Sequence, residues 1–222
     1  MSEFITDFII DFETLNTTPE AILVECSAIP FVLDIANPPK FNDLVNSGIK
    51  IKFDIQSQKL LGRTTSSGTI KWWKNQGEEA RKLLRPTKED VTLFDGYEVI
   101  RDFFLNNDIK FKKSHIWTRG EMDVLWLRSW YKYSLDLSDD DVSDMTPVMF
   151  NNFREIRSVV ESNLSRDQTY CPLPVGSLPG FVKHDSLHDC ARDIMMLVWS
   201  KRYSYGLEDI PSEIDPNSKR GN

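Results

Sequence analysis

The pattern of apolar and polar positions predicts three strands at the start of the chain. Residues 4–12 and 21–33 are mostly apolar runs, as in strands that are buried on both faces. Residues 16–19, Asn-Thr-Thr-Pro, are a strong turn signal between the two runs, which together predict a hairpin. A shorter alternating run over residues 49–53 predicts a third strand.

Helical periodicity dominates the rest of the chain. The polar stretch up to Gly68 predicts a mobile loop, and residues 154–160 begin a strand or a helix. Three prolines exclude regular structure from Cys171 to Pro179, and the polar tail after Pro211 is expected to be disordered. We expect helices at residues 69–84, 97–105, 122–133 and 186–203, a short strand at 114–118 and a surface loop at 138–144.

Length and composition fit one α/β domain. Strands that alternate with helices predict an α/β fold around a mixed central sheet flanked by helices. The 222 residues, 40% of them hydrophobic, can bury one core, which we place at residues 1–210 before a tail at 211–222. No apolar run approaches the roughly 20 residues of a membrane span, and the amino end carries acids where a signal peptide carries bases. We therefore expect a cytoplasmic protein with no membrane segment.

Cysteine usage and charge exclude further classes of protein. The three cysteines are far apart and form no C-x-x-C pair, which argues against a disulfide framework and a thiolate zinc site. The net charge of −7 argues against a protein that coats nucleic acid by long-range attraction. A nuclease stays open, because cations held by clustered carboxylates reverse the local charge. Two basic clusters are phosphate contacts or solvated surface: Lys110, Lys112 and Lys113, and Arg81, Lys82 and Arg85.

Two carboxylates stand near the end of the first predicted strand. Asp11 and Glu13 are two positions apart, so their side chains share one face of the strand while Phe12 lies on the other. Two like charges at the end of an apolar strand are costly unless a cation neutralises them, and hard oxygen ligands suit Mg²⁺ or Mn²⁺. Taken alone, the pair also fits a strand that runs out into solvent.

Acids and a histidine elsewhere in the chain can complete such a site. Asp123 begins an apolar helix just after the predicted strand at 114–118, which places its carboxylate at the strand-end edge of the sheet. His184 lies five positions before Asp189, in a loop that leads into the last helix. Its ring can therefore lie over a site that Asp189 helps to build.

The order of these motifs resembles the DEDDh exonucleases, a class that includes proofreading exonucleases, oligoribonuclease and ribonuclease T. Residues 8–14, Phe-Ile-Ile-Asp-Phe-Glu-Thr, are very similar to its first motif, and residues 184–190 follow His-x-x-Leu-x-Asp-Ala with Cys in place of Ala. In the middle motif, Arg119 stands where relatives often have Asn, and Met122 where they often have Phe. The resemblance spans residues 7–200.

A second pair of residues has the same spacing as His184 and Asp189. His188 and Asp193 are also five positions apart and are the alternative active pair. We prefer the first register because Leu187 then matches the leucine of the class. The residue four positions before Asp189 is an aspartate, which argues against the sister class that uses a tyrosine there.

Two further segments resemble exonuclease A of T-even bacteriophages and a related bacterial exoribonuclease family. They are residues 69–76, Thr-Ile-Lys-Trp-Trp-Lys-Asn-Gln, and residues 153–157, Phe-Arg-Glu-Ile-Arg. Trp72 and Trp73 point about 100° apart on a helix, so we expect one to pack in the core and the other to stack on a base.

Four other residues near these motifs are expected to contact the substrate or an acid. Arg154 or Arg157 binds a phosphate or pairs with a carboxylate, and the sequence favours neither alternative. By resemblance to the class, Thr14 and Leu15 hold the terminal nucleotide.

The resemblance implies a ribonuclease H-like fold and a metal-dependent 3′-5′ exonuclease that acts on the 3′ end of single-stranded nucleic acid, with DNA slightly favoured over RNA. Two Mg²⁺ or Mn²⁺ ions, about 3.5–4 Å apart, would clamp the scissile phosphate. His184 would be the general base that activates the attacking water. The metal ligands would be Asp11, Glu13, Asp123 and Asp189.

Other functions stay open at this point. An exoribonuclease of the same class is the first alternative, because contacts to a 2′-hydroxyl cannot be placed from the sequence. Residues 11–15, Asp-Phe-Glu-Thr-Leu, also resemble the Asp-x-Asp-x-Thr motif of aspartate-nucleophile phosphatases. The match is imperfect, because a glutamate stands where the motif has its second aspartate. A nucleic-acid-binding module without activity is the third. The sequence does not decide the oligomeric state and leaves a homodimer open.

Overall fold

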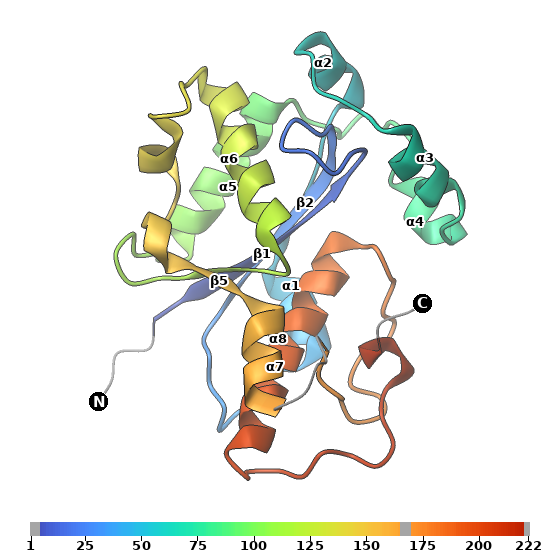
Figure 1. The fold of residues 1–222 in the computed structure, drawn as a ribbon, viewed down its shortest axis with the longest axis vertical. Helices are drawn as coiled ribbons and strands as arrows, with labels where there is room; N and C mark the ends of the chain where they lie inside the picture. Colours follow the sequence, from blue (N-terminus) through green and yellow to red (C-terminus); the bar gives the residue numbers. More distant parts are fainter. Residues whose placement is uncertain (1–4, 165–169, 220–222) are drawn as a thin grey trace.

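A five-stranded mixed sheet organises residues 5–164 and 170–219, which this computed structural model describes (Figure 1). The order of the strands is β3-β2-β1-β4-β5; β2 pairs antiparallel with β1 and β3, and β4 pairs parallel with β1 and β5. The predicted mixed sheet and opening hairpin are confirmed, and Phe4 of the first predicted strand lies outside the described residues. The strands are β1 (Asp7–Thr14), β2 (Leu23–Phe31), β3 (Ile49–Lys52), β4 (Ile116–Thr118) and β5 (Phe153–Glu155).

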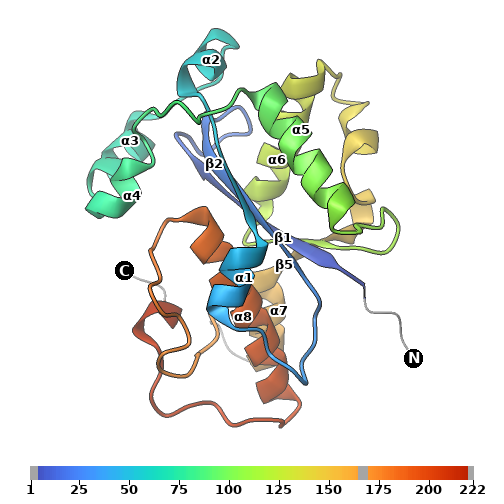
Figure 2. The same cartoon turned by 180° about the vertical axis from the view of Figure 1, so that it is seen from behind.

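Helices cover both faces of the sheet and enclose two separate cores (Figures 1 and 2). One face packs against α5 (Leu93–Asn106) and α6 (Glu121–Leu135). The other packs against α1 (Phe41–Ser47), α7 (Ile156–Leu164) and α8 (Ser186–Ser204). This arrangement confirms the α/β fold, and the segment from residue 154 is first a strand and then a helix. None of the described helices is long and apolar enough to cross a membrane.

β1 divides its side chains between the two cores. Phe8, Ile10 and Phe12 are buried in the core beneath α5 and α6, whereas Ile9 is buried in the core beneath α8. Because side chains alternate along a strand, Asp11 and Glu13 share the face of Ile9 and point toward α8. The predicted shared face of the two acids, opposite Phe12, is confirmed.

Three short helices form a small lobe beside the far end of the hairpin. They are α2 (Ile55–Leu60), α3 (Ser67–Lys74) and α4 (Glu78–Lys82), and Trp73 is the largest side chain of their core. The mobile loop predicted up to Gly68 is wrong, because Asp54 caps α2 by accepting hydrogen bonds from the backbone N–H groups of Gln56 and Ser57. The single helix predicted at 69–84 is also wrong: Gly77, a poor helix former, separates α3 from α4.

The segment after Pro211 is ordered up to residue 219. Ile214 forms an antiparallel bridge with Pro174, and Pro216–Ser218 form one 3₁₀ turn. Asp215 is 3% exposed. The predicted disorder is wrong for residues 211–219, because a polar composition does not reveal that these side chains and backbone groups find partners. Residues 220–222 of the predicted tail lie outside the described residues.

Candidate active site

The carboxyl ends of three parallel strands gather the predicted site residues at one edge of the sheet. Asp11 and Glu13 lie near the end of β1, Asp123 lies in the first turn of α6 after β4, and Arg157 lies in the first turn of α7 after β5. Ligands of open α/β sheets bind outside the carboxyl ends of the strands. The topology therefore places these four residues where a ligand is expected.

A cavity of about 630 Å³ opens at this edge. Its volume lies within the roughly 300–1,000 Å³ of ordinary ligand sites. Asp11 and Glu13 line it from β1, Trp72 lines it from α3, His184 lines it from the loop before α8, and Asp189 lines it from the first turn of α8. Elements that are far apart in the sequence thus line the same cavity.

Four carboxylates lie close together, and burial together with the charges of Asp123 and Asp189 raises the pKa of Asp11 and of Glu13. Burial is the main cause of the raised pKa of Asp11 and Glu13; Asp123 contributes most among the acids around Asp11, and Asp189 among those around Glu13. Burial raises the pKa of Asp123 to about 7 against hydrogen bonds from the backbone of Phe12 and Arg119. It raises the pKa of Asp189 to about 6 against the charge of Arg192. Asp11, Glu13 and Asp189 line the cavity, and their raised pKa values mean that these carboxyls cannot all ionise unless a cation neutralises them, whereas Asp123 lies outside the described lining.

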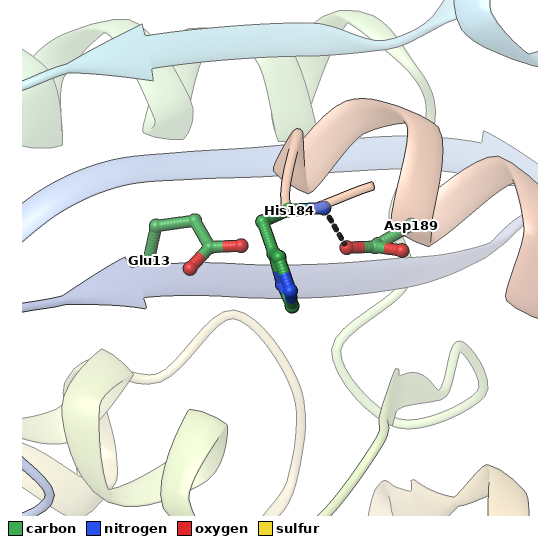
Figure 3. Close-up of side chains that lie close together, drawn as sticks. All are labelled: Glu13, His184 and Asp189. Atoms are coloured by element: carbon green, nitrogen blue, oxygen red, sulfur yellow. Dashed lines mark hydrogen bonds between the residues drawn. The ribbon is translucent and has the colours of Figure 1, made fainter. Parts of the chain in front are cut away.

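Glu13, His184 and Asp189 form a donor set suited to a cation. One ligand atom from each lies within 4.8 Å of the others. Figure 3 shows the two carboxylates approaching His184 from opposite sides, one from β1 and one from α8. Asp11 lies beside this set, since Asp189 and Glu13 both raise its pKa. Carboxylate oxygens suit hard divalent cations such as Mg²⁺ and Mn²⁺, and buried like charges need a neutralising partner, so the residues fit the expected metal.

His184 is held over the floor of the cavity by its backbone. Its φ of 63° is left-handed, a conformation that residues with a Cβ rarely adopt, and its N–H donates to Oδ2 of Asp189 at 3.1 Å. The imidazole packs against the ring of Trp72, with centroids 4.7 Å apart. Burial, followed by Lys183 and Arg192, lowers the pKa of His184 to about 4. The ring is therefore uncharged at neutral pH.

The alternative histidine lies elsewhere. His188 packs edge-on against the ring of Phe41 at 5.3 Å, and its Nδ1 accepts a hydrogen bond from the N–H of Val182. Its companion Asp193 is buried and forms an ion pair of 2.7 Å with Arg119. The structure thus brings His184 to the cavity and places His188 in a packing role; which histidine acts in catalysis stays a prediction.

Glu25 positions the start of α8, a role that the sequence reasoning missed. This buried carboxylate accepts hydrogen bonds from the N–H of Ser186 at 3.2 Å and from its Oγ at 2.6 Å. Lys50 lies 3.8 Å away. The contacts fix the first turn of α8, and with it Asp189. A signal was present, because Glu25 is the single charge in the apolar run at 21–33 and a buried charge requires partners.

Cations surround the acidic floor, and most of them were not anticipated. Arg192 lies 2.8 Å from Oδ1 of Asp189, and Arg119 is held by Asp193. Arg157 pairs with Glu155 at 2.8 Å, which confirms the pairing with an acid, and it also lines the cavity, where phosphate binding stays a prediction. The basic clusters around Lys112 and Arg81 do not belong to its described lining. Arg119, Arg157, Lys183, Arg192 and Lys219 line the cavity.

The two tryptophans divide as the helical geometry predicts. Trp72 is 42% exposed and lines the cavity, whereas Trp73 is fully buried and its Nε1 donates to the carbonyl of Thr14 at 2.9 Å. Trp73 is therefore the ring that packs in the core and does not contact the substrate, although both tryptophans were candidates for that contact, and Trp72 is the ring that remains available to stack on a base. Thr14 and Leu15, each 8% exposed, lie beside the cavity and outside its described lining.

Arg154 does not reach the cavity lining. Its guanidinium donates to the backbone carbonyls of Asn151 and Phe153. Of the two arginines considered for phosphate binding, the structure therefore brings only Arg157 to the cavity.

Comparisons with known proteins identify relatives of the sequence and of the fold. Residues 6–199 match the model of a family described as the 3′-5′ exoribonuclease Rv2179c-like domain. The sequence is similar to the exodeoxyribonuclease of Enterobacteria phage T4, with 42% identity over 214 residues, which cover 93% of this chain and 94% of that protein.

Solved structures of E. coli exonuclease I share the fold. A zinc-bound complex with single-stranded DNA has a TM-score of 0.53 and 14% identity over 94% of this chain and 42% of that chain. A complex with a dA16 oligonucleotide has a TM-score of 0.51 and 13% identity over 90% and 41%. The chain thus spans less than half the length of these structures. They confirm the ribonuclease H-like fold, and at this identity they show the fold alone.

Proposed function

Because this chain belongs to the family of 3′-5′ exoribonuclease Rv2179c-like domains and is a hydrolytic 3′-5′ exonuclease, we propose that it removes nucleotides from the 3′ end of single-stranded DNA. The observation that carries this proposal is the set of buried carboxylates and one imidazole at the carboxyl edge of the sheet. The phage T4 relative supports DNA, because it is an exodeoxyribonuclease that matches nearly over its full length.

The acids are the proposed holders of two divalent cations, Mg²⁺ or Mn²⁺. Ligand atoms of Glu13 and Asp189 lie close to each other and to His184. Asp11 and Asp123 add two further carboxyl groups beside them. Bound there, the cations would stabilise charge that develops on the scissile phosphate and lower the pKa of water. Without them, mutual repulsion and burial keep these acids from ionising together.

His184 is the proposed general base. Its pKa of about 4 leaves the imidazole uncharged at neutral pH, with a lone pair available to accept a proton from water. The resulting hydroxide attacks the phosphorus, and the bond from phosphorus to the 3′ oxygen of the preceding nucleotide breaks. That oxygen takes up a proton from water to become the new 3′-hydroxyl of the strand, and the terminal nucleotide leaves as a nucleoside 5′-monophosphate. The hydrogen bond from the N–H of His184 to Asp189 fixes the backbone of His184 next to the acids.

Trp72 and the cations of the cavity are the proposed contacts to the strand. The exposed ring of Trp72 offers a stacking surface, worth roughly 1–3 kcal/mol per base. Arg157 and Lys183 line the same cavity and supply positive charge for phosphate oxygens. This local charge explains how a chain with a net charge of −7 accommodates a polyanion.

Digestion of end-labelled single-stranded DNA, double-stranded DNA and single-stranded RNA with Mn²⁺ tests the proposal. With a 5′ label on single-stranded DNA, we expect a ladder that shortens stepwise from the 3′ end, and slower hydrolysis of the other two. Faster hydrolysis of RNA would replace this proposal by the second candidate, an exoribonuclease, which the description of the family favours. Absence of hydrolysis of all three substrates would contradict both.

A further inference from the structure

The segment after Ile214 is built into the molecule through Asp215. The N–H of Asp215 donates to the carbonyl of Leu173 at 2.8 Å, and its carboxylate accepts from the N–H of Leu178 at 3.2 Å and from the N–H of Asn217 at 3.0 Å. The side chain therefore joins two stretches of backbone that are 37 residues apart. Its burial, with 3% exposure, shields these hydrogen bonds from water.

The part of the core to which this segment is fixed is tightly packed. Leu173 is fully buried in the core beneath α8, and Leu178 is 3% exposed in the same core. Ser218 is also fully buried, and its Oγ donates to the carbonyl of Asp215 at 2.7 Å. Figure 1 shows the 3₁₀ turn beside α8, close to the end of the chain. The turn is thus a fixed part of the fold around α8.

The residues of the turn face the same cavity as the acids. Pro216, Asn217, Ser218 and Lys219 line it together with Asp11, Glu13 and His184. Asn217 and Lys219 are exposed, whereas Glu13 is buried and Asp11 and Asp189 are half-buried. Their amide and ammonium groups are hydrogen-bond donors, and such donors contact phosphate and sugar oxygens without reading sequence.

We propose that residues 216–219 form a wall that binds the phosphodiester backbone of the substrate strand, with Lys219 and Asn217 as the donors and Asp215 as the positioning residue. The proposal rests on the proposed function, since it assigns the ligand of the same cavity. Because the donors are exposed and the acids are buried or half-buried, the wall contacts a phosphate next to the scissile one. A phosphate group fits this place because it is an anion. Lys219 attracts it from one side, and the divalent cations proposed at the acids attract it from the other.

The first test compares two lysines at opposite edges of the sheet. Lys219→Ala removes the donor of the wall, and Lys112→Ala removes an exposed lysine before the amino end of β4. The measurement is the fluorescence anisotropy of a 5′-fluorescein (dT)₁₂ strand with Ca²⁺ in place of a catalytic metal, at several salt concentrations. We expect Lys219→Ala to raise Kd about 3- to 10-fold and to flatten the salt slope by about 0.7, the value for one lost contact to a single strand. Lys112→Ala should change neither, and equal effects of the two variants would overturn the wall.

The second test asks whether Asp215 acts through the wall. Asp215→Ala should weaken binding and flatten the salt slope as Lys219→Ala does, and the double variant should lose no more than the larger single loss, because the two residues form one unit. Asp215→Asn keeps one acceptor oxygen and should restore part of the affinity. Fully additive losses in the double variant would overturn the role of Asp215.

The failure of the wall is distinguishable from the failure of the proposed function. The nitrophenyl ester of thymidine 5′-monophosphate carries one phosphodiester and no neighbouring nucleotide, so its hydrolysis by the wild-type protein with Mn²⁺ reports on the acids and His184. Hydrolysis of the ester, with Lys219→Ala binding (dT)₁₂ as tightly as Lys112→Ala, contradicts the wall alone. Absence of ester and oligonucleotide hydrolysis contradicts the proposed function, and with it the wall.

Discussion

Asp7 and Asp11 lie on the same face of one strand, yet their surroundings differ. At the amino end of β1, the carboxylate of Asp7 accepts hydrogen bonds from the N–H of His115 at 2.8 Å and from Nε1 of Trp117 at 2.9 Å. At the carboxyl end, the charges that act most strongly on Asp11 are those of Asp123 and Glu13, which are negative as well.

The difference teaches how a buried acid is assigned a role. A carboxylate whose oxygens meet N–H donors is satisfied by the protein itself and acts as a structural link. A carboxylate buried among other carboxylates lacks compensation within the chain and indicates an external cation. Four predictions contrast the two ends of β1, and the first has the largest expected effect.

Charge removal at the two ends should separate activity from stability. Asp11→Asn should lower kcat by at least about 10³-fold, because a metal ligand supports several kcal/mol of transition-state stabilisation and each 1.36 kcal/mol is tenfold in rate. Asp7→Asn should leave kcat within about twofold and cost roughly 1–3 kcal/mol of unfolding free energy, since one of the two N–H groups that donate to its oxygens loses its acceptor. Initial rates on labelled single-stranded DNA and urea unfolding measure the two quantities. Full metal-dependent hydrolysis by Asp11→Asn would refute the assignment of the site.

The three histidines extend the comparison. His184→Ala should lower kcat by about 10²-fold or more, the usual contribution of a general base. His115→Ala, which removes the ring nitrogen beside Asp7, and His188→Ala, which removes the ring against Phe41, should retain activity and lose stability only. Single-turnover rates across these variants provide the measurement. An unchanged rate in His184→Ala together with an inactive His188→Ala would show that the second register is the active one.

Metal binding should stabilise the folded protein, and this stabilisation should depend on the acids at the carboxyl end of β1 and not on Asp7 at its amino end. With Mn²⁺ at 100 times its Kd, the folded state should gain about 2.7 kcal/mol, which is a rise in Tm of about 5–10 °C for a chain of this size. Asp7→Asn should show the same rise, whereas Glu13→Gln should show little of it, because Glu13 belongs to the donor set. Thermal scans with EDTA and with Mn²⁺ decide this, and an equal rise in Glu13→Gln would exclude Glu13 as a ligand.

The pH dependence of metal-free stability should be the smallest effect. The pKa of Asp123 is about 7 in the folded protein and about 3.9 in an unfolded chain, so the folded state binds the proton more tightly. This stabilisation is complete below pH about 4 and is lost as the pH rises through 7. From pH 6 to pH 8 in EDTA, the wild type should lose about 1.4 kcal/mol through this group, so Asp123→Asn should gain about 3–5 °C in Tm relative to it, at about 2–4 °C per kcal/mol. A constant difference between the two proteins over this range would contradict the raised pKa.

Local sequence patterns were sufficient to predict the parts of the site that depend on the direction in which neighbouring side chains point. Alternation along β1 placed Asp11 and Glu13 on one face, and the helical angle between Trp72 and Trp73 separated an exposed ring from a buried one. The position of Asp123 followed from a strand that leads directly into a helix. In each case, the geometry is fixed within a few residues, so the sequence contains it.

Long-range pairing limited the rest. Glu25 meets Ser186, Arg119 meets Asp193 and Asp215 meets Leu178, and each pair joins segments whose approach is set by the packing of whole elements. No periodicity marks such partners. For the same reason, the segment at 211–219 has the composition of a disordered tail although its buried groups have partners.

The left-handed backbone of His184 sets activity against stability. A residue with a Cβ pays roughly 1–2 kcal/mol for this conformation, whereas glycine adopts it freely. Selection for heat resistance alone would therefore favour glycine at position 184 and would discard the imidazole in the process. Variants of this protein recovered from such a screen should be tested for hydrolysis before their higher melting temperature is counted as an improvement.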